Sequence, residues 1–304
     1  MSVDVSFQEI VEDDAGFTAW LRRRARSLRG NWVGILSALF ILTLVVFALG
    51  GSSITPHDPA AQDLRARLLP PFWAIGGTTE YLLGTDQLGR DLLSRMMAGT
   101  KVTLIIGLAA AGLEAVIGVT LGVIAGFKGG RIGAVIMRLV DIQMGFPAAL
   151  IILFIILLTG GGTYMIPIAL AVNGWMIFAR VVRVSVSQLR ATGFVEAAVA
   201  SGISSTRIVF THVVPHIFGT VLTIFLFEVP RIILAESTLS FIGLGVQPPD
   251  ISWGLMIGGS RSLLQVAFHL SFFPGVMIML AVLAMNMFSS WIEPVLDPQR
   301  RSRL

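Results

Sequence analysis

The chain has 304 residues, of which 55% are hydrophobic and only 13% are charged. A soluble domain carries about 25% charged residues, so lipid rather than water must cover much of this protein. The absence of cysteine excludes disulfides and thiolate metal sites. The net charge of +4 is spread over many loops, and we expect no nucleic-acid partner.

Apolar segments of about 20 residues, the length that crosses a lipid bilayer, recur along the chain. They predict an all-α polytopic membrane protein with six transmembrane helices, at residues 31–50, 101–127, a third ending near 159, 164–182, 213–242 and 270–290. Pro147 is expected to kink the third helix. The predicted division is a cytoplasmic segment at 1–30, a first transmembrane anchor at 31–50, an external loop at 51–100, a transmembrane core at 101–291 and a cytoplasmic tail at 292–304.

The basic residues predict the orientation, because cytoplasmic segments of membrane proteins are rich in Lys and Arg. With both termini cytoplasmic, the internal segments hold most of these residues: Arg22, Arg23, Arg24, Arg26, Arg29, Lys128, Arg131, Arg138, Arg180, Arg183, Arg190, Arg207, Arg300, Arg301 and Arg303. The external segments hold fewer: Arg65, Arg67, Arg90, Arg95 and Arg261. We therefore expect Ser252 to be reachable from outside the cell and Ser204 only from the cytoplasm.

Four charged residues fall inside predicted spans: Glu114, Glu228, Arg231 and Glu236. Such residues are costly in lipid and usually face the bundle interior or an aqueous path. Glu114 fits a neutral or paired structural group as well as a pathway residue, and both interpretations stay open. Glu228 and Arg231 are three residues apart on a helix, so we expect them to pair. The same spacing predicts a pair between Arg138 and Asp141.

One polar stretch of the external loop contains Gly84, Asp86, Gly89, Arg90, Asp91, Ser94 and Arg95 in the pattern GTDQLGRDLLSR. Its two glycines suit a tight turn, and Asp91 is expected to cap the helix that follows. A phosphate-binding loop is excluded because no Gly-Lys-Ser/Thr ending follows. A catalytic pair of Asp86 and Asp91 has no nucleophile or metal ligand beside it. We assign the stretch a structural or gating role.

A moderately polar island separates the fourth and fifth spans and reads EAAVASGISSTRIVFTHVVP from Glu196 to Pro215. Residues 193–201 suit a short helix, and Gly202 is a plausible stop because glycine tolerates left-handed backbone. Ser204 or Ser205 is expected to cap a second helix. The island is therefore predicted to be a bent helical pair that projects from the basic, cytoplasmic face.

The island resembles the EAA loop of ABC importer permeases, with Glu-Ala-Ala, three residues, Gly202, nine residues and then His212-Val-Val-Pro215, where the family has Ile-x-Leu-Pro. The stretch from Gly84 to Arg95 resembles the GTDxxGRDxxSR signature of dipeptide, oligopeptide and nickel permeases. Residues 239–254 resemble their LSFLGLGxQPPxPxWG signature, in which Trp253 suits the membrane interface. The resemblance covers about residues 83–298.

This resemblance implies a five-helix permease core and a coupling loop at 193–212, which docks on an ATPase subunit through Glu196, Ala197, Ala198, Gly202 and Arg207. It implies a second homologous permease, two ATPase subunits that bind ATP and Mg²⁺, and a periplasmic or lipid-anchored substrate-binding protein, assembled at a bacterial inner membrane. The chain itself is expected to hold no cofactor or metal and not to be an enzyme. Relatives import dipeptides, oligopeptides, nickel complexes, and sometimes sugars or opines, so the substrate stays open among these.

Two other classes of protein compete with this interpretation. An intramembrane enzyme would use His212 and His216, but these residues have no third metal ligand at a useful spacing. An ion-driven carrier would rely on Glu114, Glu228 and Glu236. Purification separates the classes, because an importer brings ATPase subunits with it.

Overall fold

Helices make up nearly all the regular structure of residues 32–296, the part of the chain that the computed structural model describes. No strand occurs in this range beyond one isolated bridge between Thr85 and Asp91. The predicted all-α class is confirmed. The predictions for residues 1–30 and for the basic residues after 296 lie outside the described range.

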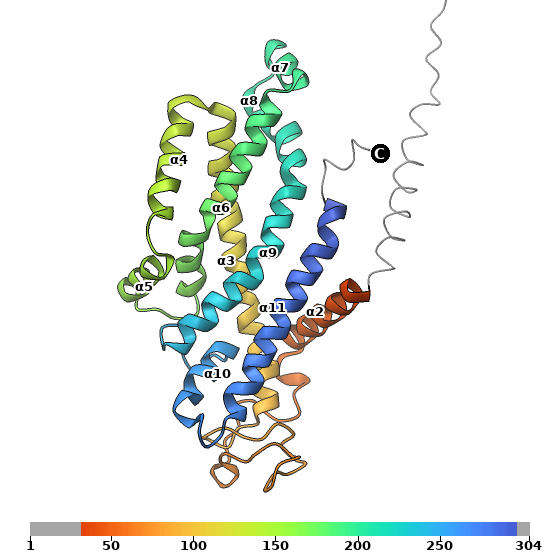
Figure 1. Ribbon diagram of the computed structural model, residues 1–304, viewed down its shortest axis with the longest axis vertical. Helices are drawn as coiled ribbons and strands as arrows, with labels where there is room; N and C mark the ends of the chain where they lie inside the picture. The colour runs from red at the N-terminus through yellow and green to blue at the C-terminus, as the bar shows by residue number, and fades with distance from the viewer. Residues whose placement is uncertain (1–31, 297–304) are drawn as a thin grey trace, which may run out of the picture.

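Five long helices form the body of the molecule (Figure 1): α2 (Trp32–Gly50), α3 (Leu92–Lys128), α6 (Met165–Arg190), α9 (Val214–Phe241) and α11 (His269–Leu296). Shorter elements connect them: α4 (Gly130–Met144), α5 (Ala148–Thr159), α7 (Gly193–Ala200), α8 (Ser205–Ile208), a π-helical turn η3 (Val209–Val213) and α10 (Trp253–Ser260). Each long helix is long and apolar enough to cross a membrane, alone or, for α9, together with α8 and η3. The number of spans is six if α4 and α5 are counted as one broken span.

The third predicted span is a broken helix rather than a kinked one. The axes of α4 and α5 differ by 91° at the break. Pro147 has no N–H to donate and stands in extended backbone at the start of α5. Proline also disfavours helical backbone at the preceding residue, Phe146, so the helix stops instead of bending.

Helix α3 begins earlier than the sequence predicted, at Leu92 instead of Lys101. Asp91 caps it as expected, and its side chain accepts a hydrogen bond from the backbone N–H of Ser94 at 3.0 Å. The 37 residues of α3 span about 55 Å, which exceeds the hydrocarbon thickness of a bilayer. Its first turns therefore belong with the loop at 51–91 that precedes it.

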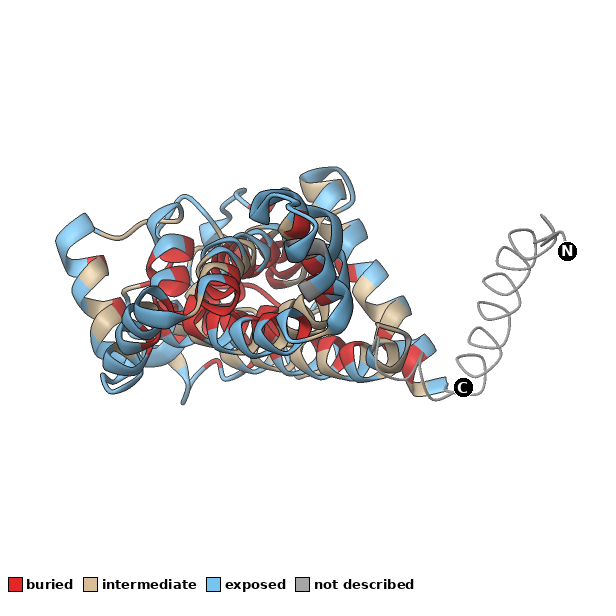
Figure 2. Cartoon of the chain, turned by 90° about the horizontal axis from the view of Figure 1, so that it is seen from above, coloured by how far each residue is buried: buried red, intermediate tan, exposed pale blue. Residues whose placement is uncertain are grey.

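The two ends of the molecule carry different elements (Figure 1). Helices α7 and α8 lie at one end with the turn between α3 and α4, whereas the loop at 51–91 and α10 lie at the opposite end. Viewed along the long axis, buried residues gather in the middle of the bundle and exposed ones surround them (Figure 2). Many exposed side chains are large and apolar, such as Leu36, Leu39 and Leu42 on α2. Lipid or a partner subunit is therefore the natural surrounding for this surface.

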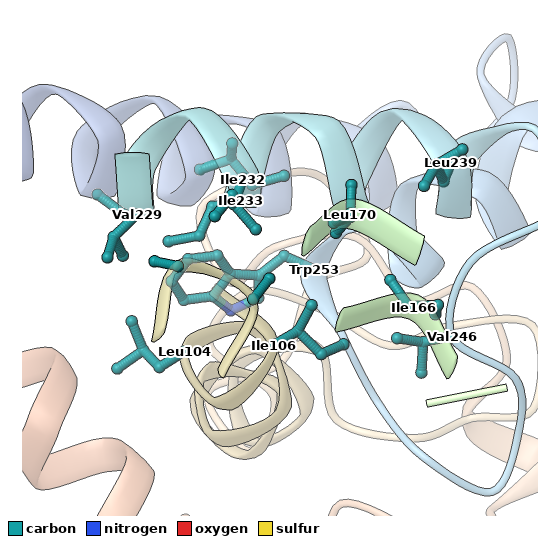
Figure 3. Close-up of a cluster of buried hydrophobic side chains, with 14 of the residues drawn as sticks. Leu104, Ile106, Ile166, Leu170, Val229, Ile232, Ile233, Leu239, Val246 and Trp253 are labelled. Atoms are coloured by element: carbon teal, nitrogen blue, oxygen red, sulfur yellow. The ribbon is translucent and has the colours of Figure 1, made fainter. Parts of the chain in front are cut away.

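The main core lies where α3, α6 and α9 meet, and the indole of Trp253 fills it (Figure 3). Trp253 is fully buried, and its Nε1 donates to the carbonyl oxygen of Met96 at 2.9 Å. The sequence suggested a side chain suited to the membrane interface, whereas Trp253 packs inside the protein. Helix α10 folds back between α3 and α9. The sequence shows only that Trp253 follows a proline-rich loop, and this position does not predict the fold-back.

Helices α3 and α6 pack closely along a row of glycines in α3. A Cβ atom at Gly118, Gly122 or Gly126 would lie under 3 Å from backbone or side-chain atoms of α6. Such small residues allow close approach in lipid, where van der Waals packing replaces the hydrophobic effect between helices. Gly112, on the same helix, would meet no atom within 4 Å.

Replacing Gly122 with alanine is expected to lower the melting temperature of the purified protein. The new methyl group would stand 2.8 Å from the carbonyl oxygen of Ala179 and from Cβ of Val182, so the two helices must separate. Such overpacking costs about 1–3 kcal/mol. Gly112→Ala is the matched control and should leave the melting temperature unchanged or slightly higher, since alanine is the better helix former. Equal melting temperatures for both variants would contradict the packing.

Candidate functional site

The segment from Gly193 to Val213 forms the bent helical pair that the sequence predicts. Helix α7 ends before Gly202, whose φ of +76° lies in the left-handed region, and α8 begins at Ser205. Ser204 occupies the capping position of α8, but its side chain makes no capping hydrogen bond. Glycine is the residue that this backbone conformation favours, so the bend follows from Gly202.

Helix α7 is anchored on one face and exposed on the other. Val195 is fully buried in a cluster with Val186, Leu189, Ile208 and Val213, which joins α6, α7, α8 and η3. The outer face presents large apolar side chains, with Phe194 50% exposed, Ile203 39% and Phe210 69%. Ala197, Gly202 and Arg207 are also exposed. The side chains of Glu196 and Ala198 lie outside the described residues.

The bent pair continues directly into α9. Residues Ser205–Phe241 form one apolar helical run that includes α8, η3 and α9. A π-helical turn interrupts the α-helical pattern of this run, and such turns often occur at functional positions in helices. Val195 and its neighbours thus pack α7 against the start of this run.

A charged cluster links α3 and α9 in the middle of the bundle. Arg231 donates from Nη2 to Oε1 of Glu114 at 3.3 Å, and from Nε to Oε2 of Glu228. Glu114 is fully buried and its second oxygen has no hydrogen-bond partner among the described residues, whereas the Arg231 side chain is 43% exposed. Gly174 of α6 makes room for the Glu114 carboxylate, because a Cβ there would overlap it. The structure thus contains the expected pair of Glu228 and Arg231 and adds Glu114, which sequence spacing could not reveal.

A different pair from the predicted one forms at α4. The Oδ1 atom of Asp141 accepts from Nη2 of Arg180 at 2.6 Å, across the contact between α4 and α6. The predicted pair of Arg138 and Asp141 is wrong, because a neighbouring helix supplies a better-placed guanidinium. Arg138 is exposed instead.

Glu236 organises the loop that follows α9. Its Oε1 accepts from the hydroxyls of Ser240 at 2.7 Å and Ser252 at 2.9 Å, and it is fully buried. The Ser240 hydroxyl also accepts a hydrogen bond from the backbone N–H of Val246 at 3.1 Å, and the Ser252 hydroxyl accepts one from the backbone N–H of Leu255 at 3.2 Å. One carboxylate thereby fixes the end of α9, the loop and the start of α10. Ser252 is fully buried by this arrangement, so the expectation that it is reachable from outside is wrong.

Replacing Glu236 with leucine is expected to reduce the yield of folded protein much more than replacement with glutamine. Leucine leaves the Ser240 and Ser252 hydroxyls without their acceptor, at about 1–3 kcal/mol for each unsatisfied group. Glutamine keeps one side-chain oxygen that can accept from both hydroxyls. Fluorescence-detected size-exclusion chromatography measures the folded fraction. Equal losses for the two variants would show that the hydroxyl contacts do not stabilise the loop.

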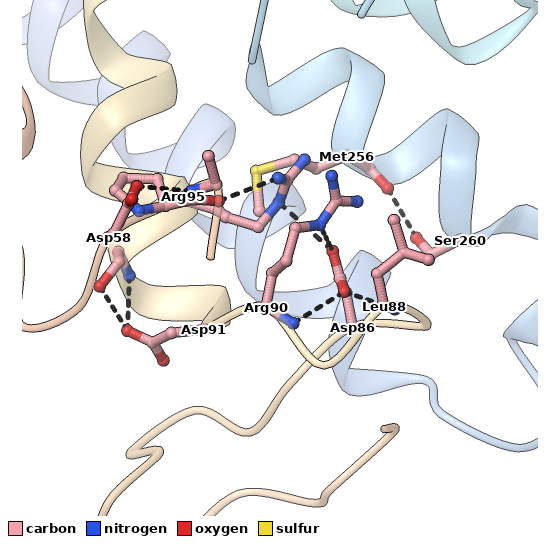
Figure 4. A network of polar contacts seen from close by, with 11 residues as sticks. Asp58, Asp86, Leu88, Arg90, Asp91, Arg95, Met256 and Ser260 are labelled. Carbon is pink, nitrogen blue, oxygen red and sulfur yellow. Dashed lines mark hydrogen bonds and ion pairs between the residues drawn. The ribbon is translucent and has the colours of Figure 1, made fainter. Parts of the chain in front are cut away.

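Asp86 is the centre of a second network, in the loop before α3 (Figure 4). Its Oδ1 accepts the backbone N–H of Leu88 at 2.8 Å and of Arg90 at 3.1 Å, and its Oδ2 lies 2.7 Å from Nε of Arg90 and 3.4 Å from Nε of Arg95. Gly84 and Gly89 have φ values of +85° and +72°, and a Cβ at either would overlap a carbonyl oxygen. The predicted tight turn is present. Asp91 accepts from Ser94 and lies 3.4 Å from the His57 ring, so it caps α3 rather than forming a catalytic pair with Asp86.

Comparisons with known proteins agree with this arrangement. Residues 118–302 match the family model of the binding-protein-dependent transport system inner membrane component. The chain belongs to this family. Residues 18–71 match the N-terminal transmembrane domain of oligopeptide transport permease C. The chain is thus a permease component of an inner-membrane transport system, as predicted, and its family is not one of enzymes.

Several curated relatives cover most of the chain. The dipeptide transport system permease protein DppC of Bacillus subtilis is 35% identical over 91% of this chain and 85% of its own length. The di/tripeptide transport system permease protein DppC of Pseudomonas aeruginosa is 35% identical over 88% of this chain and 89% of its own length. The nickel transport system permease protein NikC of Escherichia coli K12 is 34% identical over 89% of this chain and 96% of its own length. An inward-facing structure of the MetNI methionine ABC transporter matches with a TM-score of 0.53 and 16% identity over 66% of this chain and 96% of that one, which supports the fold.

Proposed function

We propose that this chain forms half of the translocation path of an ABC importer for di- or oligopeptides and couples that path to ATP hydrolysis through α7. The observation that carries the proposal is the bent pair α7–α8, which is exposed at one end of the molecule and continuous with α9. Phe194, Ile203 and Phe210 give it an apolar face that fits a groove on a partner. Glu196, Ala197, Ala198, Gly202 and Arg207 belong to the same docking element.

The proposed partners are a second homologous permease, two ATPase subunits and an external substrate-binding protein. The family depends on a binding protein by its description. The sequence contains no Gly-Lys pair, and hence no phosphate-binding loop of the Walker type. ATP and Mg²⁺ are therefore bound by the ATPase subunits, and this chain contributes no catalytic residue.

The cluster of Glu114, Glu228 and Arg231 is proposed to face the translocation path or the second permease. A guanidinium that is partly exposed within a span cannot face lipid without a large cost. Arg231 continues into an exposed stripe of α9 with Leu234 and Thr238 at helical spacing. An intramembrane metalloenzyme has no comparable support, because the described residues contain no group of three His, Cys, Asp or Glu that could hold a metal.

Short peptides are the proposed substrates because relatives named for dipeptide and di/tripeptide transport align over most of the chain. The similarity to a nickel permease keeps nickel complexes as an alternative, beside sugars and opines. Expression with the candidate partners and uptake into liposomes tests the proposal. An importer should copurify with ATPase subunits and accumulate peptide only with ATP and the binding protein. Purification without an ATPase would support an ion-driven carrier instead.

Single cysteines test the orientation, since the chain has none of its own. Cysteine at Gln265, which is exposed beside α10, should react with an impermeant maleimide in intact cells. Cysteine at Ser204, exposed in the coupling loop, should react only after the inner membrane is opened. The reverse pattern would contradict both the orientation and the docking role of α7.

A further inference from the structure

A cavity of about 350 Å³ lies between the external loop and α10. One wall comes from residues 60–95 and includes Arg90 and Arg95, and the other comes from residues 248–263 and includes Asp250 and Met256. Pockets that hold small ligands have volumes of about 300–1,000 Å³ and a few polar groups on apolar walls. The cavity is separate from the Glu114 cluster, because none of the residues that line the cavity belongs to that cluster.

The first wall carries unused hydrogen-bond donors. Figure 4 shows the guanidinium groups of Arg90 and Arg95 beside the Asp86 carboxylate, which both contact through Nε. Arg95 also donates from Nη1 to the carbonyl oxygen of Pro59 at 3.2 Å. Both terminal nitrogens of Arg90 and Nη2 of Arg95 have no hydrogen-bond partner among residues 32–296. A guanidinium with free terminal nitrogens is suited to a carboxylate, and these two are held in place before any ligand arrives.

The opposite wall carries a carboxylate and apolar side chains. Asp250 is exposed, and its Oδ2 accepts a hydrogen bond from the Thr163 hydroxyl at 2.5 Å. Thr163 itself does not line the cavity. Its other oxygen has no partner in the described part of the chain. Leu255 and Met256 of α10 supply apolar surface between the charged groups.

The charges favour a ligand that carries both signs. Arg90 and Arg95 are balanced formally by Asp86 and Asp250, so the cavity has no net charge to attract a simple anion. Asp86 already accepts from four donors, so it offers no free acceptor to a ligand. The polar atoms that stay unpartnered among the described residues are terminal nitrogens of Arg90 and Arg95 on one wall and the second carboxylate oxygen of Asp250 on the other. Such separated charges match the ends of a zwitterion. An acidic side chain of a binding protein would satisfy only one wall and would meet Asp250 unfavourably.

We propose that this external cavity binds a short zwitterionic peptide. Arg90 and Arg95 bind its terminal carboxylate, Asp250 accepts from its ammonium group, and Leu255 and Met256 contact an apolar side chain. The choice of a peptide as the ligand rests on the proposed function. The charges and the volume of the cavity are observations that do not depend on that function. The cavity is then a subsite of the permease itself, in addition to the site on the binding protein.

A cysteine placed in the cavity reports on occupancy. Gly259 lines the cavity, and a Cβ there would meet no atom within 4 Å, so Gly259→Cys places a thiol in the space without a clash. The full transporter complex in nanodiscs, without binding protein, is treated with iodoacetamide, and modification of this chain is followed by mass spectrometry. Saturating Ala-Phe is expected to slow the modification at least about tenfold, a change equivalent to 1.4 kcal/mol. Ser262→Cys, exposed nearby but outside the lining, is the control and should react at the same rate with or without peptide.

Three comparisons identify what protects the thiol. Ala-Phe amide, which lacks the carboxylate, and N-acetyl-Ala-Phe, which lacks the ammonium group, should each protect at least about tenfold less well than Ala-Phe. Arg90→Gln in the Gly259→Cys background should remove the protection, whereas Arg261→Gln, an exposed external arginine outside the lining, should not. No protection by Ala-Phe, or equal protection by the amide, would overturn the proposal. Protection by the loaded binding protein alone would also overturn it, by assigning the cavity to docking. Uptake of Ala-Phe is measured in parallel, so that transport without protection rejects only the subsite, and protection without transport rejects only the peptide substrate.

Discussion

Gly202→Asp is expected to abolish uptake while the subunit still assembles in the membrane. Gly202 adopts a φ of +76° at the bend between α7 and α8, where a side chain costs about 1–2 kcal/mol. A Cβ there would meet no atom of the described residues within 4 Å, so this part of the subunit has space for it. The added carboxylate instead enters the exposed apolar surface of Phe194 and Ile203, which is proposed to dock on the ATPase. ATP hydrolysis stimulated by loaded binding protein, measured in liposomes, should fall together with uptake.

Two controls separate the bend from the docking surface. Gly202→Asn has the same size without the charge and tolerates left-handed backbone, so it should retain more uptake than Gly202→Asp. Gly130→Asp places the same charge at another glycine with positive φ, +52°, and open space, at the first residue of α4, directly after the turn from α3. This variant should transport normally, since the turn lies outside the coupling loop. Normal stimulated hydrolysis and uptake in Gly202→Asp would refute coupling through α7.

Arg231→Gln is expected to deplete the folded complex more than any other single change in the charged cluster. The arginine contacts both Glu114 and Glu228, and its loss leaves two carboxylates facing each other in the bundle. Breaking a buried pair costs about 3–5 kcal/mol, and less here to the extent that water reaches the partly exposed guanidinium. The amount of complex recovered after detergent extraction measures the effect.

Compensating changes test the same cluster. Adding Glu228→Gln to Arg231→Gln should restore part of the complex, and adding Glu114→Gln as well should restore more, because each step removes an uncompensated charge. Uptake should stay low in the triple variant if the cluster faces the path. Equal accumulation of the single, double and triple variants would show that the three residues do not depend on one another for stability.

The class of the protein and the elements that local rules control could be predicted from the amino-acid sequence. Low charge and apolar segments of membrane length predicted an all-α membrane protein, and five helices and one broken pair agree with it. Asp91 as a helix cap, the glycine turn at Gly84 and Gly89, and the bend at Gly202 follow from the preferences of single residues. The pair of Glu228 and Arg231 follows from helical spacing alone.

Tertiary structure decided every contact between helices. Glu114 joins Arg231 across 117 positions of the chain, and Asp141 selects Arg180 over Arg138, because packing places these helices side by side. Trp253 and Ser252 are buried because Glu236 folds the loop back onto α9, which no rule of spacing describes. The cavity likewise has Arg90 and Asp250, 160 positions apart in the sequence, on opposite walls. Local patterns specify backbone conformation, whereas partners of buried charges depend on which helix surfaces come together, and that arrangement is set by the summed packing of the whole bundle.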